Sequence, residues 1–489
     1  MDNKTDKRYL LTEASIIALA FICACSIASK PYIWFDESFT MGLARQSVPE
    51  LIRITAMDVH PPLYYLLVKL FITLFGDSIF VFHLPSLLCY VGLLAVSALF
   101  FNRYFDKQLS LFITAGLCSV PGMLEHVLWI RMYSMAMLLV ASGYYVTYII
   151  MKKSDGDISF RHLWKDWTGL ALINVAAAYT HYFAGVAVVG SSMFLLFFLL
   201  LKKRHLRAFI PWGIHCGIML LLYLPWIPVL FQQMSAIDGN YWIQPVSEME
   251  LHTYPAILFF VNNDMMRHIL IILFVTGCFL CLLHYRRSTE ALWVVGCFVV
   301  VLFWFLFGIG YSVLRNPILV NRYFVILFPL VWIPPVYGHI LLKKTGLYAA
   351  VVIVFTFCFI QNYEAQYEYY VSSYNVSMYH YLDSHLQEGD IFFHSFVQNQ
   401  TVYEAYFPEY DHYVLDTTMG MEMESVRALS GGQVISSIEE IPDNAVNIWC
   451  SDDGGISGFD MTTFEALGCH VETIELTGGR LYHVFKNLP

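Results

Sequence analysis

The sequence predicts a polytopic α-helical membrane protein with about 11 transmembrane helices and a C-terminal extracellular α/β domain. Of its 489 residues, 58% are hydrophobic and 13% are charged, which is too little charge to cover a soluble protein of this size. Apolar runs of about 16–24 residues recur up to position 363, and this length matches the roughly 30 Å of a bilayer. Short mixed segments follow, so we expect a membrane domain at 1–363 and a second domain at 364–489.

The positions of Lys and Arg predict which side of the membrane each loop faces. Cytoplasmic loops retain positive charge, and most basic residues here fall in six short stretches. We therefore expect a cytoplasmic N-terminus, a first helix that is not cleaved as a signal peptide, and an extracellular C-terminal domain. The six stretches are the N-terminus, 101–107, 152–166, 202–207, 284–287 and 343–344.

The apolar segment 62–75 does not fit a simple crossing. It is shorter than the roughly 20 residues that a spanning helix needs, and it contains Lys69. The alternation of sides also requires an odd number of crossings between His60 and Arg103. We expect 62–75 to lie at the membrane interface or to re-enter, which leaves about eleven crossings.

The C-terminal segment is strongly acidic but has the pattern of a folded domain. Arg427, Arg480 and Lys486 are its only basic residues after position 363, a balance that excludes unaided binding of nucleic acid. Apolar runs such as "DIFFHS", "AVNIWC" and "RLYHVF" indicate strands, and "NQTVYEAYF" indicates a helix. We expect a small α/β domain that acts as a lid or recognises the acceptor.

The first external loop, 31–61, concentrates ionisable residues at the membrane surface. "WFDESFT" contains the adjacent carboxylates Asp36 and Glu37, and "MDVHPPLYY" contains Asp58 and His60. The prolines after His60 fix the direction of the next helix, because proline lacks an amide donor and restricts its predecessor. Taken alone, Asp36 and Glu37 would be interpreted as the polar end of a helix.

Three further polar clusters lie at predicted outer ends of helices. A single cation at the membrane edge often only extends toward the lipid headgroups. Together with the loop, however, these clusters place a base and several receivers for an anion on one membrane face. They are "WIRMYS" with Arg131 and Tyr133, "AYTHYFAG" with His181 and Tyr182, and "NPILVNRYF" with Asn321 and Arg322.

A base and an anion receiver at the outer surface fit sugar transfer from a polyprenyl phosphate. The lipid tail holds such a donor in the bilayer, with its phosphate at the level of the headgroups. Asp36 is the residue we expect to accept the proton of an attacking hydroxyl or amine. Arginine matches the geometry of the departing phosphate. One base and a stable anionic leaving group predict a single displacement that inverts the anomeric centre.

These stretches also resemble a known family. "WFDESFT" followed by "DVHPPLYYLL" resembles the aspartate-glutamate loop and His-Pro-Pro segment of the GT-C superfamily of lipid-sugar-dependent membrane glycosyltransferases. That superfamily includes the protein O-mannosyltransferases (glycosyltransferase family 39) and the aminoarabinose transferases of lipid A. "RMYS", "YTHYF" and "NRYFVILFPL" resemble later signatures of bacterial members, in the same order. The resemblance covers roughly residues 8–363.

The resemblance implies a role for each site residue. Asp36 would be the catalytic carboxylate that activates the acceptor, while Glu37 and Asp58 would orient it, bind the acceptor or hold a cation. Arg131, His181 and Arg322 would neutralise the donor phosphate. The residues expected to bind substrate are His60, Arg131, Tyr133, His181, Tyr182, Asn321 and Arg322.

The chain departs from the family pattern before Arg131. Many relatives have a Gln-Glu-Ala run directly before the Arg-x-Tyr, where this chain has Leu128, Trp129 and Ile130. The nearest acid is Glu125. The function of that family glutamate is therefore absent here or has moved.

Two other classes of function remain as alternatives. A lipid or sugar transporter, or flippase, places ionisable groups at mid-bilayer on broken helices in repeated halves. Here the polar clusters sit mostly at outer helix ends, and the sequence has no internal repeat. A non-catalytic scaffold is the other alternative, against which the intact carboxylates and arginines argue.

The expected partners follow from the proposed chemistry. They are a polyprenyl-phosphate-sugar donor, an extracytoplasmic acceptor (a protein, a lipid or a cell-envelope polymer) and membrane lipids, with no nucleic acid. A divalent cation held by Asp36 and Asp58, with water completing its shell, is one option. A carboxylate acting without metal is the other.

Overall fold

Two compact units make up the chain. The helical unit consists of Met1–Cys25, His60–Tyr64 and His83–Ala365, and the sheet unit consists of Ser26–Val59, Tyr65–Phe82 and Gln366–Pro489. The first external loop thus folds with the C-terminal segment, although more than 300 residues separate them in sequence. The computed structural model describes residues 3–203, 209–236, 243–259, 261–283, 288–342, 345–416, 424–442, 445, 447–452, 454 and 458–486.

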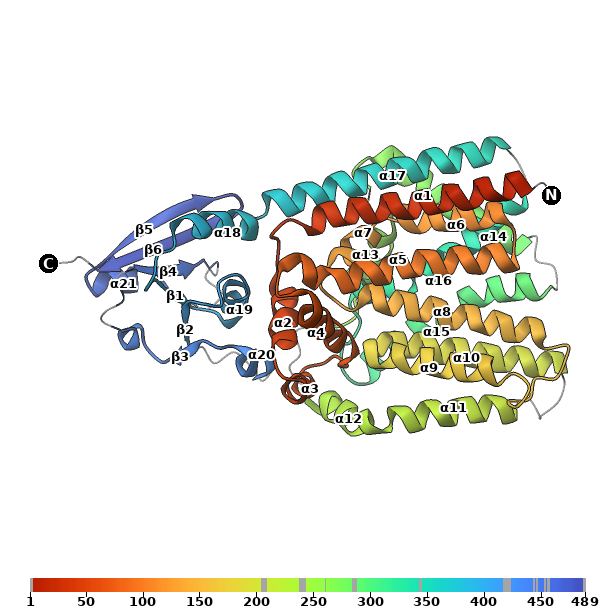
Figure 1. The fold of residues 1–489 in the computed structure, drawn as a ribbon, viewed down its shortest axis with the longest axis horizontal. Helices are drawn as coiled ribbons and strands as arrows, with labels where there is room; N and C mark the ends of the chain where they lie inside the picture. Colours follow the sequence, from red (N-terminus) through yellow and green to blue (C-terminus); the bar gives the residue numbers. More distant parts are fainter. Residues whose placement is uncertain are drawn as a thin grey trace. The chain divides into compact units, whose positions relative to one another are not determined.

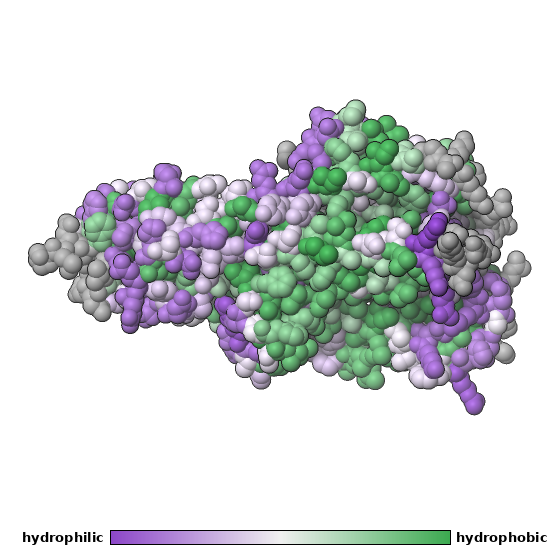
Figure 2. All heavy atoms as spheres, turned by 45° about the horizontal axis from the view of Figure 1, so that its top comes forward, coloured by the Kyte–Doolittle hydropathy of each residue, from purple (hydrophilic) through white to green (hydrophobic). Residues whose placement is uncertain are grey.

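Long helices with nearly parallel axes form the helical unit (Figure 1). Apolar side chains dominate the face that these helices show in Figure 2, as expected for a surface solvated by lipid. The elements that lie wholly or mainly in this unit are α1 (Asn3–Ala28), α5 (Ile79–Tyr104), α6 (Lys107–Ser119), α7 (Met123–Leu128), α8 (Tyr133–Lys153), α9 (Trp164–Thr180), α10 (Tyr182–Lys203), α11 (Phe209–Tyr223), η2 (Leu224–Trp226), α12 (Ile227–Ala236), α13 (Glu248–Phe259), α14 (Asp264–Leu283), α15 (Thr289–Leu314), η3 (Asn321–Leu327), α16 (Phe328–Leu341) and α17 (Thr345–Ser372).

Nine helices in the described part of the chain are long and apolar enough to cross a membrane, judged by length and composition. The helices α6 and α9 are shorter, with 13 and 17 residues, and alternate with these candidate spans along the chain. The described part of the chain therefore has nine candidate spans, compared with the eleven crossings predicted, because α6 and α9 are shorter than the roughly 20 residues that a span needs. The side of the membrane that each loop faces stays a prediction, and the basic residues 204–207, 284–287 and 343–344 lie outside the described ranges.

Helices α14 and α16 approach each other so closely that no side chain fits at the contact. A Cβ atom added at Gly338 would overlap the carbonyl oxygen of Gly277, and one added at Gly277 would overlap the carbonyl oxygen of Pro335. Small residues at such contacts are typical of membrane helices, which associate through close packing. The tight pair fixes α16, which follows η3 and its Arg322 directly in the chain.

The sheet unit confirms the predicted α/β domain. Its six strands have the order β3-β2-β1-β4-β6-β5. The pairs β1–β2, β2–β3 and β1–β4 are parallel, and β6 runs antiparallel to β4 and β5. The elements after α17 are α18 (Tyr374–His385), β1 (Ile391–His394), α19 (Val397–Tyr406), β2 (Asp411–Leu415), α20 (Glu424–Leu429), β3 (Gln433–Ile435), η5 (Ile438–Glu440), β4 (Asn447–Ser451), α21 (Thr462–Ala466), β5 (Cys469–Leu476) and β6 (Gly479–Lys486).

Both faces of the central strands are buried, as is usual where parallel strands are covered by helices. Ile391 and Phe393 of β1 lie in one hydrophobic cluster with Ile448 of β4. Because side chains alternate along a strand, Phe392 and His394 point to the opposite face. There Phe392 stacks on His412, with ring centroids 4.8 Å apart.

A directed chain of hydrogen bonds joins two histidines on that second face. His412 Nε2 lies 3.0 Å from the carbonyl oxygen of Phe407, so Nε2 carries the proton and Nδ1 accepts from His394 Nε2 at 3.1 Å. His394 Nδ1 in turn accepts from the hydroxyl of Ser451 at 3.2 Å. Both rings are therefore neutral. Burial lowers the pKa of His394 well below its ordinary range and lowers the pKa of His412 to about 4.

We expect the sheet unit to lose stability as pH falls from about 6.5 toward 4. In this pH range the histidines take up protons in the unfolded chain but stay neutral in the folded one. The free energy of unfolding therefore decreases as the pH is lowered. For His412 alone the loss is about 3 kcal/mol. The protection factors of amides in β1 and β2, which correct hydrogen exchange for its intrinsic dependence on pH, should fall between pH 6.5 and 4.5, and less so in His412→Gln. If the variant lost as much stability at low pH as the wild type does, protonation of His412 would not be the cause of the loss.

Segment 62–75 forms the short helix α4 (Leu63–Phe75), and its lysine has a structural partner. Thirteen helical residues reach only about 20 Å, which is too short to cross the bilayer. Lys69 Nζ donates to the carbonyl oxygens of Ala44 and Gln46, at 3.3 and 2.5 Å. Ala44 lies in the last turn of α2 (Phe35–Arg45), and Gln46 is the residue that directly follows this helix. Lys69 thus caps the C-terminal end of α2, where the negative end of the helix dipole favours a cation. The first turn of the same helix carries Asp36.

Candidate active site

The adjacent carboxylates of the first loop lie in the first turn of α2 and have different surroundings. Glu37 is fully buried, and its Oε2 accepts a hydrogen bond from the backbone N–H of Trp34 at 3.2 Å. It therefore closes the start of the helix, as glutamate does at the third helical position. Asp36 is half-buried, and the N-terminal end of α2 favours its negative charge. Of the two, Asp36 is the better candidate for a base.

Asp58 ends the next helix, α3 (Val48–Met57). Its backbone N–H donates to the carbonyl oxygens of Ile54 and Thr55, both at 3.2 Å, and the residue is half-buried. In the chain it stands two residues before His60, the first residue of the next stretch of the helical unit. Asp58 thus marks the exit of the first loop.

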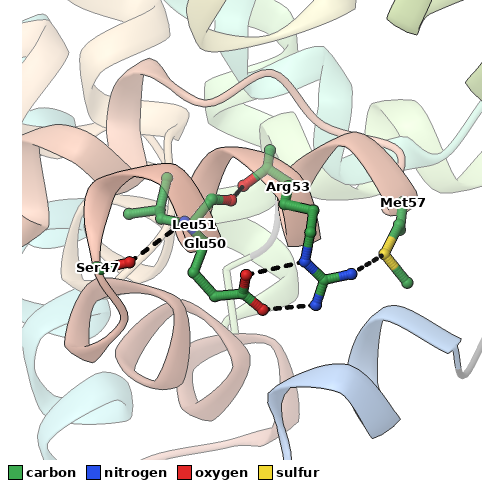
Figure 3. A network of polar contacts seen from close by, with 6 residues as sticks. Ser47, Glu50, Leu51, Arg53 and Met57 are labelled. Atoms are coloured by element: carbon green, nitrogen blue, oxygen red, sulfur yellow. Dashed lines mark hydrogen bonds and ion pairs between the residues drawn. The ribbon is translucent and has the colours of Figure 1, made fainter.

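The remaining carboxylate of the loop is engaged on the surface of α3 (Figure 3). The carboxylate of Glu50 receives two hydrogen bonds from the Arg53 guanidinium, at 2.8 and 2.5 Å, and Arg53 also donates to the sulfur of Met57 at 3.4 Å. The hydroxyl of Ser47 caps the helix by accepting from the N–H of Glu50 at 3.4 Å. An exposed ion pair of this kind adds little stability, and it leaves Glu50 outside the candidate site.

Within the described ranges, no group of three or more His, Cys, Asp or Glu side chains gathers in the geometry of a metal site. A cation on Asp36 and Asp58 would therefore take most of its ligands from water and substrates, which is how Mg²⁺ is often bound. The cation stays a prediction.

In the helical unit, aromatic rings from separate segments surround His181, which stands between α9 and α10. Its ring centroid lies 4.8 Å from that of Tyr323, 5.6 Å from that of His60 and 6.0 Å from that of Tyr133. The sequence placed His60, Tyr133 and His181 in three separate clusters, and the fold brings them together. Tyr323 was not predicted as a site residue, although it follows Arg322 directly.

Two arginines act on the same ring. The charges of Arg131 and Arg322, with that of His60, disfavour a proton on His181, and burial acts more strongly in the same direction. Together they hold the pKa of His181 well below its ordinary value, so the ring is neutral. We name His60, Arg131, His181 and Arg322 the cationic cluster, because it concentrates positive charge around one buried imidazole.

The tautomer of His181 follows from its backbone contact. The N–H of Phe183 donates to His181 Nδ1 at 3.1 Å, so the neutral ring carries its proton on Nε2. This Nε2 atom is buried and has no hydrogen-bond partner among the described residues. An unsatisfied buried donor is costly. Beside two arginines, it is suited to an anionic oxygen supplied by a ligand.

Side chains of α4 and α5 hold the backbone that carries Arg131. Ser86 donates to the carbonyl oxygens of Trp129 and Arg131, at 2.8 and 3.2 Å, and shares a 2.6 Å hydrogen bond with Tyr64. His83 contacts the carbonyl oxygen of Leu128 at 2.6 Å. Sequence reasoning missed these supports, because a Ser or His within an apolar run gives no sign of its partner.

The short helix α7 contains Glu125, the acid nearest to Arg131 in the sequence. Glu125 lies beside His126, whose pKa is lowered mainly by burial and in part by the charge of Arg322. His126 Nδ1 contacts the carbonyl oxygen of Gly122 at 2.7 Å, and its ring lies 5.6 Å from that of Tyr133. His126 is therefore a neighbour of the cationic cluster that the sequence did not single out.

The other two predicted substrate-binding residues lie near the cluster in sequence but differ in their contacts. Asn321 is half-buried and begins η3, directly before Arg322. Tyr182 accepts a hydrogen bond from the indole N–H of Trp226 at 3.0 Å and donates to the side chain of Gln233. Tyr182 thus contacts η2 and α12, whereas the neighbouring His181 contacts the aromatic rings.

Comparison with known proteins identifies the fold. The model of the dolichyl-phosphate-mannose-protein mannosyltransferase family matches residues 59–228, which is less than half of the chain. The crystal structure of ArnT from Cupriavidus metallidurans in the apo state has 10% sequence identity and a TM-score of 0.63, and it covers 96% of this chain and 97% of ArnT. The chain has the fold of ArnT. No curated protein sequence matches it.

A second structure extends the comparison. ArnT from Cupriavidus metallidurans bound to undecaprenyl phosphate has 10% identity and a TM-score of 0.64, and it covers 97% of this chain and 98% of ArnT. At this identity the likeness concerns the fold alone. The segment matched to the mannosyltransferase family contains His60, Arg131 and His181, while Asp36 and Arg322 lie outside it. The partial match to a mannosyltransferase family thus falls within a chain that shares the fold of ArnT over nearly its whole length.

Proposed function

We propose that the chain is an inverting membrane glycosyltransferase that moves a sugar from a polyprenyl-phosphate donor to an extracytoplasmic acceptor. The observation that carries this proposal is the cationic cluster around the buried Nε2–H of His181. Charge-assisted hydrogen bonds from arginine and histidine are the strong ones for a phosphate. ArnT, with the same fold, binds undecaprenyl phosphate, which supports a lipid phosphate as the ligand.

In the proposed reaction, the acceptor oxygen or nitrogen attacks the anomeric carbon of the sugar. The Asp36 carboxylate accepts the acceptor's proton while the bond between the anomeric carbon and the phosphate oxygen breaks. The electron pair of that bond leaves with the polyprenyl phosphate, whose charge Arg131, His181 and Arg322 stabilise. Because the attack is a single displacement, the anomeric configuration inverts.

The other predicted residues support this step. Glu37 fixes the turn that holds Asp36, and Asp58 orients the acceptor or binds a cation. His60, Tyr133, Tyr182 and Asn321 shape the donor side. The distribution of Lys and Arg predicts that the N-terminus lies in the cytoplasm and the C-terminal domain outside the cell. The acceptor is a protein, a lipid or a cell-envelope polymer at that outer surface.

Replacing His181 by Phe should weaken the binding of polyprenyl phosphate by roughly 10- to 100-fold. Phe keeps the ring contact with Tyr323 but lacks the Nε2–H, and a hydrogen bond to a charged group contributes about 1.5–3 kcal/mol. The dissociation constant is measured with purified protein in detergent. His268→Phe, at an exposed position of α14, should bind as the wild type does. An unchanged constant in His181→Phe would contradict a phosphate site at the cationic cluster.

A further inference from the structure

The extended residues that lead into α2 obtain their hydrogen bonds from the C-terminal domain, residues 366–489 of the sheet unit. The hydroxyl of Tyr406 donates to the carbonyl oxygen of Pro31 at 2.7 Å. The side-chain amide of Asn375 donates to the carbonyl oxygen of Ile33 at 2.6 Å. Backbone carbonyls outside regular structure need such partners when they are buried. The path of residues 31–34 therefore depends on side chains that come late in the sequence.

Tyr32, between these two anchored carbonyls, is fixed by the same part of the chain. It is 5% exposed, and its hydroxyl shares a 2.8 Å hydrogen bond with that of Tyr369. Its ring also lies 4.6 Å from the ring of Tyr370. Three consecutive residues, 31 to 33, are thus each held by a side chain from beyond position 365.

The body of α2 is held by the same domain. The hydroxyl of Ser38 lies 3.0 Å from that of Thr401 on α19. A Cβ atom at Gly42 would lie 2.7 Å from the side chain of Leu429 on α20, so glycine permits the close approach of the two helices. At the far end, the Arg45 guanidinium donates to the carbonyl oxygen of Ala405 on α19 at 3.4 Å.

Asp36 cannot move independently of residues 31–34, because it belongs to the hydrogen-bonded turn that follows them. The carbonyl oxygen of Trp34 accepts from the N–H groups of Glu37 and Ser38, at 3.0 and 2.9 Å, and Glu37 bonds back to the N–H of Trp34. Asp36 lies inside this closed turn. A shift of residues 31–33 would therefore be passed directly to its carboxylate.

We propose that the C-terminal domain is a positioning element for Asp36, with Tyr406 and Asn375 as its principal positioning residues. This inference rests on the proposed function, in which Asp36 is the base. It gives the acidic domain a role different from that of a lid or an acceptor-binding module. The domain sets where the proton acceptor stands, and a displacement of about 1 Å in such a group can lower the rate 10²-fold.

The test removes each hydrogen bond singly. Tyr406→Phe loses only the hydroxyl and keeps the ring that packs 5.1 Å from Tyr379. Asn375→Ala removes the second hydrogen bond at a half-buried position. Because two separate variants test the same role, the result does not depend on the folding of either one. We expect kcat for sugar transfer to fall about 5- to 100-fold in each variant. The KM for the lipid donor and the binding of polyprenyl phosphate should stay at wild-type values.

A matched tyrosine in the same domain provides the control. The hydroxyl of Tyr374 bonds to Tyr403 at 3.0 Å and to the carbonyl oxygen of Arg480 at 2.8 Å, so Tyr374→Phe removes the same group from bonds inside the domain. Its kcat should equal that of the wild type. Adding Tyr406→Phe to Asp36→Asn should not lower the residual rate further, because no base remains to be positioned. A merely structural defect would lower it further.

The outcomes separate this inference from the proposed function. A fully active Asp36→Asn would overturn the proposed function itself. An inactive Asp36→Asn, combined with wild-type kcat in both Tyr406→Phe and Asn375→Ala, would overturn only the positioning role. A rise in the KM for the acceptor with unchanged kcat would also overturn it and assign the domain to acceptor binding. A fall in kcat that disappears in the Asp36→Asn background would support positioning.

Discussion

Asp36→Asn should lower the rate of sugar transfer by about 10²- to 10⁴-fold, the range that a positioned general base contributes. Asparagine has nearly the same shape, so α2 and its contacts with the C-terminal domain should persist. What is lost is a carboxylate able to take the proton of the attacking group. Initial rates with purified protein in detergent measure the effect, and size-exclusion chromatography confirms that the variant is folded.

Glu50→Gln is the matched control for this experiment. Glu50 belongs to the same external loop, but its carboxylate is exposed and paired with Arg53. The loss of one solvent-screened ion pair should change stability little and should leave transfer intact. If Asp36→Asn is as active as Glu50→Gln, Asp36 is not the base.

Arg322→Ala should reduce kcat/KM for the lipid donor by about 10²- to 10³-fold, as the removal of one group that stabilises developing charge does. The KM for the acceptor should change little, because the arginine acts on the phosphate that leaves. Arg322→Lys should be intermediate, since lysine keeps the charge but lacks the planar fork that matches a phosphate. Steady-state kinetics with each substrate varied in turn measure the two effects separately.

Arg315→Ala gives the comparison within the same stretch of chain. Arg315 caps the end of α15 and is exposed, so its removal should leave both kinetic constants unchanged. Equal losses for donor and acceptor in Arg322→Ala would mean that Arg322 supports the fold instead of binding the phosphate.

The elements of this protein were largely predictable from sequence, because their signals are local. Apolar length marked the spanning helices, and short apolar runs marked strands such as Ile391–His394 and Asn447–Ser451. The fold class and the family resemblance are confirmed by the structure and the comparisons. Strand β3 was missed because three residues at a sheet edge carry too short a pattern to recognise.

The supports of the site were not predictable, because they depend on tertiary contacts. The capping by Glu37 was hidden because Trp34, the residue before the helix, is not one of the usual capping types. The bonds from Tyr406 and Asn375 to the first loop join residues more than 300 positions apart. Ser86 and His83 also form tertiary contacts that the sequence does not reveal, because they hold the backbone before Arg131 from another helix. The ionisable site residues could be predicted from the sequence because of their residue type. The residues that hold them in position could not, because their contacts form only in the folded chain.

The most direct test of the account is sugar transfer by the purified wild-type protein from a panel of radiolabelled polyprenyl-phosphate sugars into envelope fractions. The account predicts transfer from one donor, release of an equal amount of polyprenyl phosphate, and a product whose anomeric configuration is inverted. A protein that binds polyprenyl phosphate yet transfers sugar from none of these donors would contradict it and would favour a transporter or a scaffold.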